Sequence, residues 1–239
     1  MPKKELFIFD MDGLMFDTER LVYECYLETA KVHGFEMQPL VFKHVIGKTQ
    51  SDIVKTLQTI YQEDEAILNW RKDIAELKYQ LIEERRTVRK KLGLIEILDF
   101  AKHHEAKIAV ASSSKREIID WYLDLEGIES YFDVKVAGDE VKRGKPDPEV
   151  FLTACHKAGI QPSNAIVMED SPAGVKAANR AGITSFYVKD DLSDLPSYAG
   201  RIKIATDMST LYLPPIQADY SVNNLFEVRD FIQKNGRVF

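Results

Sequence analysis

Two aspartates follow a short apolar run close to the start of the chain. Asp10 and Asp12 come directly after Leu6–Phe9, and a glycine stands next. A buried strand that ends in a glycine-bearing turn would deliver both carboxylates to the same place. One carboxylate could then act as a nucleophile and the other as an acid and base beside it. Together they would also supply half of a site for a hard cation.

Three later segments carry groups that could complete such a site. Ser112 begins a run of three serines behind a second apolar run, and Glu169 and Asp170 stand behind a later one. Lys145 lies in a Lys-Pro-Asp-Pro loop that precedes an expected helix. Serine can donate to a phosphoryl oxygen, lysine is a point charge suited to phosphate, and carboxylates are the oxygen ligands that Mg²⁺ prefers. This set is what phosphoryl transfer to a carboxylate would need.

Apolar runs alternate with amphipathic segments through the second half of the chain. This alternation predicts an α/β fold with a doubly wound parallel sheet. Strands are expected at residues 6–9, 107–111, 134–137, 165–168 and 184–188, and helices at 117–125, 148–158 and 172–181. Ligands of such sheets bind outside the carboxyl ends of the strands, where the polar groups above all fall.

The segment between the first two strands has helical periodicity and no convincing strand. Helices are expected from about residue 17, over 52–57 with Ser51 as the N-cap, and over 63–86. We therefore predict a catalytic core made of residues 1–15 and 89–239, with an all-helical cap inserted at 16–88. Residues 206–239 are expected to complete the core, with 218–220 as a candidate last strand.

Composition limits the classes of function. The 239 residues carry a formal net charge of −6, which provides no electrostatic footprint for nucleic acid or an anionic membrane. No stretch approaches the roughly 18 apolar residues of a membrane span, and the charged residues at the start are followed by an apolar run that stops at Asp10. Two distant cysteines suggest reduced thiols. We expect a cytoplasmic protein, with its oligomeric state open and a monomer favoured.

Each feature also has a plainer interpretation. The Asp-x-Asp-Gly segment could be only a turn, and the serine run could simply cap the helix that follows. Lys145 could be a solvated surface lysine beside other basic residues. Glu169 and Asp170 could cap the helix that begins near residue 172. Taken together, the four segments favour a site over these separate alternatives.

Four motifs in this order resemble the haloacid dehalogenase (HAD) superfamily. The chain is similar to its phosphatases and phosphomutases, and within them to the β-phosphoglucomutase-like group, which has a Rossmann-like core and a helical cap. The resemblance rests on Phe9–Glu19, Val110–Ser114, Gly144–Pro148 and Met168–Gly174. Any one of these motifs is weak evidence, whereas four in order at matching strand ends are specific.

The resemblance implies a role for each motif residue. Asp10 would attack phosphorus and form an aspartyl-phosphate, and Asp12 would protonate the leaving oxygen and later deprotonate the attacking water. Ser112 and Lys145 would hold phosphoryl oxygens, with help from Ser113. The cap would close over the substrate and exclude bulk water.

The resemblance also implies Mg²⁺ as the cofactor. Its expected ligands are the carboxylates of Asp10 and Asp170 and the backbone carbonyl of Asp12. Glu169 would bind the metal directly or support it through another ligand.

Phosphatase and mutase share these motifs, so the cap must decide between them. A histidine expected in β-phosphoglucomutases appears as Val22 here, and an arginine expected in the cap loop appears as Gln50. Both changes remove groups that would hold a second phosphate, although Lys48 could compensate in part. We therefore predict a phosphatase of a small phosphorylated metabolite, such as a sugar phosphate or nucleoside monophosphate, with a β-phosphoglucomutase-type mutase as the alternative.

Three further classes fit less well. A haloalkanoic-acid dehalogenase needs a single aspartate and no metal, so it would leave Asp12 and the Glu169–Asp170 pair unused. A response-regulator receiver domain lacks a helical insert and an aspartate two residues after its acceptor. A catalytically inactive protein that binds a phosphometabolite remains possible, but concentrated charge of this kind costs stability unless it is used.

Overall fold

The computed structural model describes residues 5–211 and 215–235 of the chain. The chain divides into two compact units, each described by itself below. The first is made of the described residues of Met1–Asp17, Thr87–Asp190 and Ile216–Phe239. The second is made of those of Thr18–Arg86 and Asp191–Pro215.

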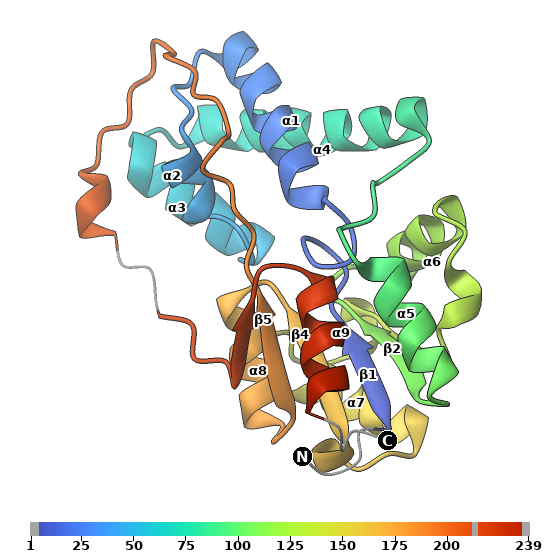
Figure 1. Cartoon of the computed structure of the whole chain (residues 1–239). Helices are drawn as coiled ribbons and strands as arrows, with labels where there is room; N and C mark the ends of the chain where they lie inside the picture. Colours follow the sequence, from blue (N-terminus) through green and yellow to red (C-terminus); the bar gives the residue numbers. More distant parts are fainter. Residues whose placement is uncertain (1–4, 212–214, 236–239) are drawn as a thin grey trace. The chain divides into compact units, whose positions relative to one another are not determined.

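The first unit is built on a parallel sheet. Among the described residues, six strands lie in the order β3-β2-β1-β4-β5-β6 (Figure 1). Their bounds are β1 (Leu6–Phe9), β2 (Lys107–Ala111), β3 (Val134–Val136), β4 (Ala165–Glu169), β5 (Thr184–Val188) and β6 (Tyr220–Val222). Every pairing is parallel, which confirms the predicted sheet.

The register of β1 determines where its carboxyl end lies. Phe9 pairs with Val110 of β2 on one side and with Met168 of β4 on the other. The residue that follows Phe9 is therefore flanked by the ends of both neighbouring strands. Strands β2 and β3 are added on one side of β1, and β4, β5 and β6 on the other. Asp10 thus stands at the topological switch point of the sheet, which is where ligands of such sheets bind.

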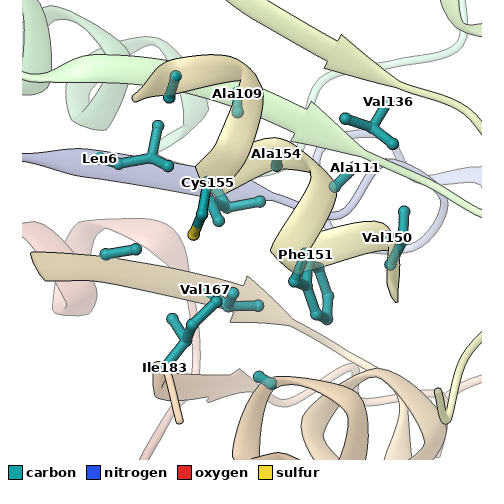
Figure 2. Packing of buried hydrophobic residues seen from close by; sticks show 14 of the residues in the cluster. Leu6, Ala109, Ala111, Val136, Val150, Phe151, Ala154, Cys155, Val167 and Ile183 are labelled. Carbon is teal, nitrogen blue, oxygen red and sulfur yellow. The ribbon is translucent and has the colours of Figure 1, made fainter. Parts of the chain in front are cut away.

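Helices cover both faces of this sheet. Residues that alternate along the strands, including Leu6, Ala109 and Val167, pack against α7 (Glu149–Ala158) and α8 (Pro172–Arg180) in one buried cluster (Figure 2). The other face is covered by α5 (Leu94–His103), which contacts β2 and packs on α9 (Leu225–Lys234). The cluster is apolar and closely interdigitated, so the sheet is a rigid platform for its strand ends.

Shorter elements complete the first unit. Helix α6 (Arg116–Leu125) follows the loop after β2, and Tyr122 in it packs edge-on against Phe16 with ring centroids 5.8 Å apart. Single turns of 3-10 helix occupy Glu129–Tyr131, Gly138–Glu140 and Pro162–Asn164, and another lies in the second unit at Met208–Thr210.

The second unit is helical. It contains α1 (Thr18–His33), α2 (Pro39–Lys43), α3 (Gln50–Tyr61) and α4 (Glu65–Arg85). Trp70 of α4 is fully buried, stacks on Phe35 with ring centroids 4.3 Å apart, and donates its indole N–H to Thr29 at 2.8 Å. The polar edge of this large side chain is therefore satisfied inside an aromatic core.

The helix over 50–61 begins earlier than expected. Its N-cap is Thr49, whose hydroxyl accepts a hydrogen bond from the backbone N–H of Asp52 at 3.3 Å. The prediction that Ser51 is the N-cap is wrong, because Ser51 already lies inside the first helical turn. Both residues are good capping types, and only the backbone conformation distinguishes them.

The described residues 191–211 and 215 belong to the helical unit, although the sequence analysis placed them in the core. Ile202 donates its N–H to the carbonyl of Gly34 and accepts from the N–H of Glu36, both at 2.8 Å. Tyr198 and Met37 exchange a similar pair of bonds at 2.8 Å. These contacts use backbone groups, so the side-chain pattern gave no sign of them.

The end of the described chain returns to the sheet. Strand β6 lies at residues 220–222, two positions after the expected 218–220, and the helix α9 that follows it was not predicted. Of the segment expected to complete the core, residues 206–211 lie in the helical unit instead. Residues 212–214 and 236–239 of that segment lie outside the described residues, as do residues 1–4, which include Lys3 and Lys4.

Both cysteines are free and buried, one in each unit. Burial raises the pKa of Cys25 to about 12 and that of Cys155 to about 11. Neither thiol has the lowered pKa of a reactive cysteine. Among the described helices, none combines the length and the apolar character that crossing a bilayer requires.

Replacing Gly200 by alanine should destabilise the helical unit. A Cβ at this position would lie 2.2 Å from the backbone carbonyl carbon of Phe35, so the backbone around residue 200 would have to shift away from Phe35. We expect a loss of about 1–3 kcal/mol in the free energy of unfolding, measured by urea denaturation. Gly144→Ala is the matched control, because nothing lies within 4 Å of its added Cβ. Equal stability of the two variants would contradict the packing of this segment.

Candidate active site

The predicted site residues gather at the carboxyl ends of the central strands. Asp10 follows β1, Ser112 follows β2, and Glu169 is the last residue of β4. Backbone hydrogen bonds tie these ends together, since Asp10 donates to the carbonyl of Met168 and Ser112 to that of Val136, each at 3.1 Å. The placement follows directly from the parallel sheet, which brings distant segments to one edge.

Lys145 reaches this edge from the loop before α7. Its Nζ contacts a carboxylate oxygen of Asp10, donates to Oε1 of Glu169 at 2.6 Å, and donates to the carbonyl of Ala111 at 3.2 Å. Its side chain is only 6% exposed, so the alternative of a solvated surface lysine is wrong. Burial acts to lower the pKa of Lys145, but the charges of Asp10 and Glu169 outweigh it and raise that pKa above its ordinary value.

Three carboxylates form a cluster beside this lysine. Asp10, Glu169 and Asp170 each offer an oxygen, and these oxygens all lie within 4.8 Å of one another. Burial, with a smaller contribution from the charge of Glu169, raises the pKa of Asp10 to about 8, although Lys145 acts in the opposite sense. A single ammonium, that of Lys145, thus faces three carboxylates in this cluster. An all-oxygen set of this kind suits a hard divalent cation, which would lower that pKa.

The carboxylate of Glu169 is held at both oxygens. Oε1 accepts from Lys145, while Oε2 accepts from the backbone N–H and the hydroxyl of Ser171, both at 2.9 Å. The hydroxyl of Ser171 also accepts from the N–H of Gly174 at 3.0 Å, so Ser171 is the N-cap of α8. The alternative in which Glu169 or Asp170 caps this helix is therefore wrong.

The Asp10–Asp12 segment is a turn as well as part of the site. Gly13 has a φ of 81°, a conformation that favours glycine, and its N–H donates to the carbonyl of Phe16 at 3.0 Å. Met11 between the two aspartates is fully buried. The two interpretations of this segment are therefore compatible, because the turn is what orients both carboxylates.

The three serines of the loop after β2 have different surroundings. Ser112 is buried, and its Oγ accepts from the N–H of Ser114 at 3.0 Å, which leaves its hydroxyl proton to donate elsewhere. Ser113 is exposed. No serine caps the next helix, because the N-cap of α6 is Lys115.

One contact of this loop was not predicted from the sequence. Ser114 Oγ donates to Oδ2 of Asp12 at 2.7 Å. The two residues are 102 positions apart, and a third serine in a run has no feature that distinguishes it from a helix-capping or surface serine. Only the pairing of β1 with β2 brings the two loops together.

The three cap candidates all lie in the helical unit, where each makes a different contact. Val22 packs at the edge of its aromatic core. Lys48 donates from Nζ to the hydroxyl of Thr56 at 2.9 Å, and Gln50 accepts from Arg71 at 2.8 Å. The resemblance leads one to expect an arginine at position 50. In this chain Gln50 stands there and binds the guanidinium of Arg71, which comes from α4. The role of these residues in specificity stays a prediction.

Comparison with known families gives one match over most of the chain. The family of haloacid dehalogenase-like hydrolases matches residues 7–188. Among curated proteins, a phosphorylated carbohydrates phosphatase of Thermotoga maritima is 35% identical over 184 residues, which are 77% of this chain and 84% of that protein. A fructose-1-phosphate phosphatase of Escherichia coli is 29% identical over 76% of this chain and 95% of that protein.

Solved structures share the fold. A β-phosphoglucomutase from Clostridium difficile superposes with a TM-score of 0.68 and covers 97% of this chain and 96% of its own. It is 24% identical in sequence, so the likeness concerns the fold alone.

Replacing Gly174 by alanine should displace the Glu169 carboxylate and so disrupt the site. The added Cβ would lie 1.7 Å from Oε1 of Glu169, and that carboxylate cannot move without losing its bonds to Lys145 and Ser171. Alanine in a helix otherwise stabilises by about 0.5–1 kcal/mol relative to glycine. We therefore expect a lower thermal midpoint and a loss of turnover, and a more stable, fully active variant would contradict the tight fit at Glu169.

Proposed function

From the premise that the chain belongs to the haloacid dehalogenase-like hydrolases and is a phosphoric monoester hydrolase, we propose that its substrates are small phosphorylated sugars. The proposed phosphatase depends on Mg²⁺ and uses Asp10 as its nucleophile. The observation that carries this proposal is the buried Lys145, which contacts Asp10 and Glu169 together. The phosphorylated carbohydrates phosphatase and the fructose-1-phosphate phosphatase among its relatives support the substrate class.

In the first half of the proposed reaction, a carboxylate oxygen of Asp10 attacks the phosphorus atom of the ester. The bond between phosphorus and the sugar oxygen breaks, and that oxygen takes a proton from Asp12 as it leaves. The products of this step are the free sugar and an aspartyl-phosphate on Asp10. Lys145 and the Ser112 hydroxyl would hold the phosphoryl oxygens, whose charge needs fixed donors.

In the second half, a water molecule attacks the same phosphorus atom. Asp12, now ionised, accepts a proton from this water, and the bond between phosphorus and the Asp10 oxygen breaks. Inorganic phosphate leaves and the Asp10 carboxylate is restored. Asp12 thus returns to its protonated form, and the cycle needs no other co-reactant than water.

The donor set at the strand ends fits Mg²⁺. Asp10 and Asp170 would hold the ion, with the carbonyl of Asp12 as a further ligand and Glu169 as a ligand or a support. When bound, the ion would neutralise negative charge on the phosphoryl group and on the clustered carboxylates. The raised pKa of Asp10 supports this assignment, because a carboxylate that acts as a nucleophile must be ionised at neutral pH.

The phosphatase is favoured over a mutase by the residues at two cap positions. A mutase has to hold a second phosphate and protect the aspartyl-phosphate from water while the sugar reorients. Val22 offers no polar group for this, and Gln50 is engaged with Arg71. The named phosphatases among the relatives point the same way.

Replacing Asp10 by asparagine should abolish phosphate release while leaving the fold intact. Asparagine has the same shape but cannot form the aspartyl-phosphate, so we expect a loss on the order of 10³-fold or more in kcat on 4-nitrophenyl phosphate and on a panel of sugar phosphates. Asp124→Asn, on the exposed surface of α6, is the control and should retain full activity. Turnover by Asp10→Asn at the wild-type rate would contradict the proposal that Asp10 is the nucleophile.

Mg²⁺ should stabilise the folded protein through Asp170. A ligand at a hundred times its dissociation constant stabilises by about 2.7 kcal/mol, so the thermal midpoint should rise with Mg²⁺ concentration and fall again when a chelator is added. Asp170→Asn should weaken this shift and the activity in parallel. An undiminished shift in that variant would place the ion elsewhere.

A further inference from the structure

Ser114 makes a contact that the proposed reaction does not yet use. We infer that Ser114 is a positioning residue, whose hydroxyl holds the side chain of Asp12 in the orientation from which it exchanges a proton with the leaving oxygen. This inference rests on the proposed function, because it takes Asp12 as the acid and base. It adds a residue that the sequence motifs did not single out for this role.

The backbone of Ser114 is fixed from both sides. Its N–H donates to Ser112 Oγ at 3.0 Å, and its carbonyl accepts from the N–H of Gly138 at 2.8 Å. Gly138 is itself held close, because a Cβ there would lie 2.2 Å from the carbonyl oxygen of Ser113. The loop after β2 therefore has little backbone freedom, so the Cα of Ser114 is held where its hydroxyl can reach Asp12.

The hydroxyl of Ser114 is directed at Asp12 and not at Asp10. Ser114 Oγ lies 2.7 Å from Oδ2 of Asp12, whereas Lys145 contacts Asp10 and Glu169. The nucleophile candidate thus has a cation among its partners, and the acid–base candidate has a neutral hydroxyl among its own. Two carboxylates only two positions apart are thereby given different surroundings, as their different roles require.

A hydroxyl suits a group that alternates between two protonation states. It can donate to a carboxylate and, after rotation, accept from a carboxylic acid, whereas an ammonium can only donate. Ser114 can therefore keep Asp12 in place before and after each proton exchange. Without the hydroxyl, Asp12 would lose this hydrogen bond, and its proton would be placed less precisely for transfer.

The test compares two esters whose leaving groups differ in their need for a proton. A phenolate is a poorer leaving group than 4-nitrophenolate, so kcat/KM on phenyl phosphate depends more on the acid than kcat/KM on 4-nitrophenyl phosphate. For Ser114→Ala we expect about a tenfold loss on phenyl phosphate and less than about a threefold loss on 4-nitrophenyl phosphate. Ser114→Thr keeps the hydroxyl and should restore most of the activity on phenyl phosphate.

Ser130→Ala, an exposed serine in the turn at Glu129–Tyr131, is the control and should match the wild type on both esters. Equal losses on the two esters in Ser114→Ala would indicate damage to the phosphate-binding loop and would overturn the inference. Unchanged kcat/KM on both esters would overturn it as well. A wild-type protein that turns over neither ester would overturn the proposed function and this inference together.

Discussion

The ammonium group of Lys145, buried between Asp10 and Glu169, is the interaction on which the site depends. All three side chains are at least nine-tenths buried, so each charge relies on the others instead of water. Removing one partner of a buried ion pair costs about 3–5 kcal/mol, because it leaves an uncompensated charge. The strand ends, the Lys-Pro-Asp-Pro loop and the N-terminus of α8 must therefore stay in register with one another.

The rest of the first unit can be understood as support for this arrangement. The register of β1 between β2 and β4 delivers Asp10 beside Glu169, and Ser171 and Gly174 fix the Glu169 carboxylate from the start of α8. The apolar cluster under α7 and α8 gives the strands a rigid base. The excess of carboxylates that remains is what a divalent cation would offset, so stability and the proposed chemistry share the same groups.

Much of the fold could be predicted from the sequence because its signals are local. Apolar runs such as 107–111 and 165–168 gave the buried strands, and the strand-end rule then brought Asp10, Ser112 and Glu169 to one edge. The features that were missed depend on tertiary contacts. The segment 191–211 joins the helical unit through backbone pairing at Ile202, and Ser114 meets Asp12 only because two loops adjoin. The capping role of Thr49 depended on backbone dihedrals that residue types do not specify.

The central claim is that Asp10 receives the phosphoryl group. Its most direct test is rapid acid quenching of the wild-type protein during turnover of 4-nitrophenyl phosphate with Mg²⁺, followed by peptide mass spectrometry of the segment around residue 10. The account predicts a phosphoryl group on Asp10 that is absent before substrate is added and absent in Asp10→Asn. Phosphate on another residue, or steady turnover with no phosphorylated intermediate on Asp10 at any quench time, would contradict it.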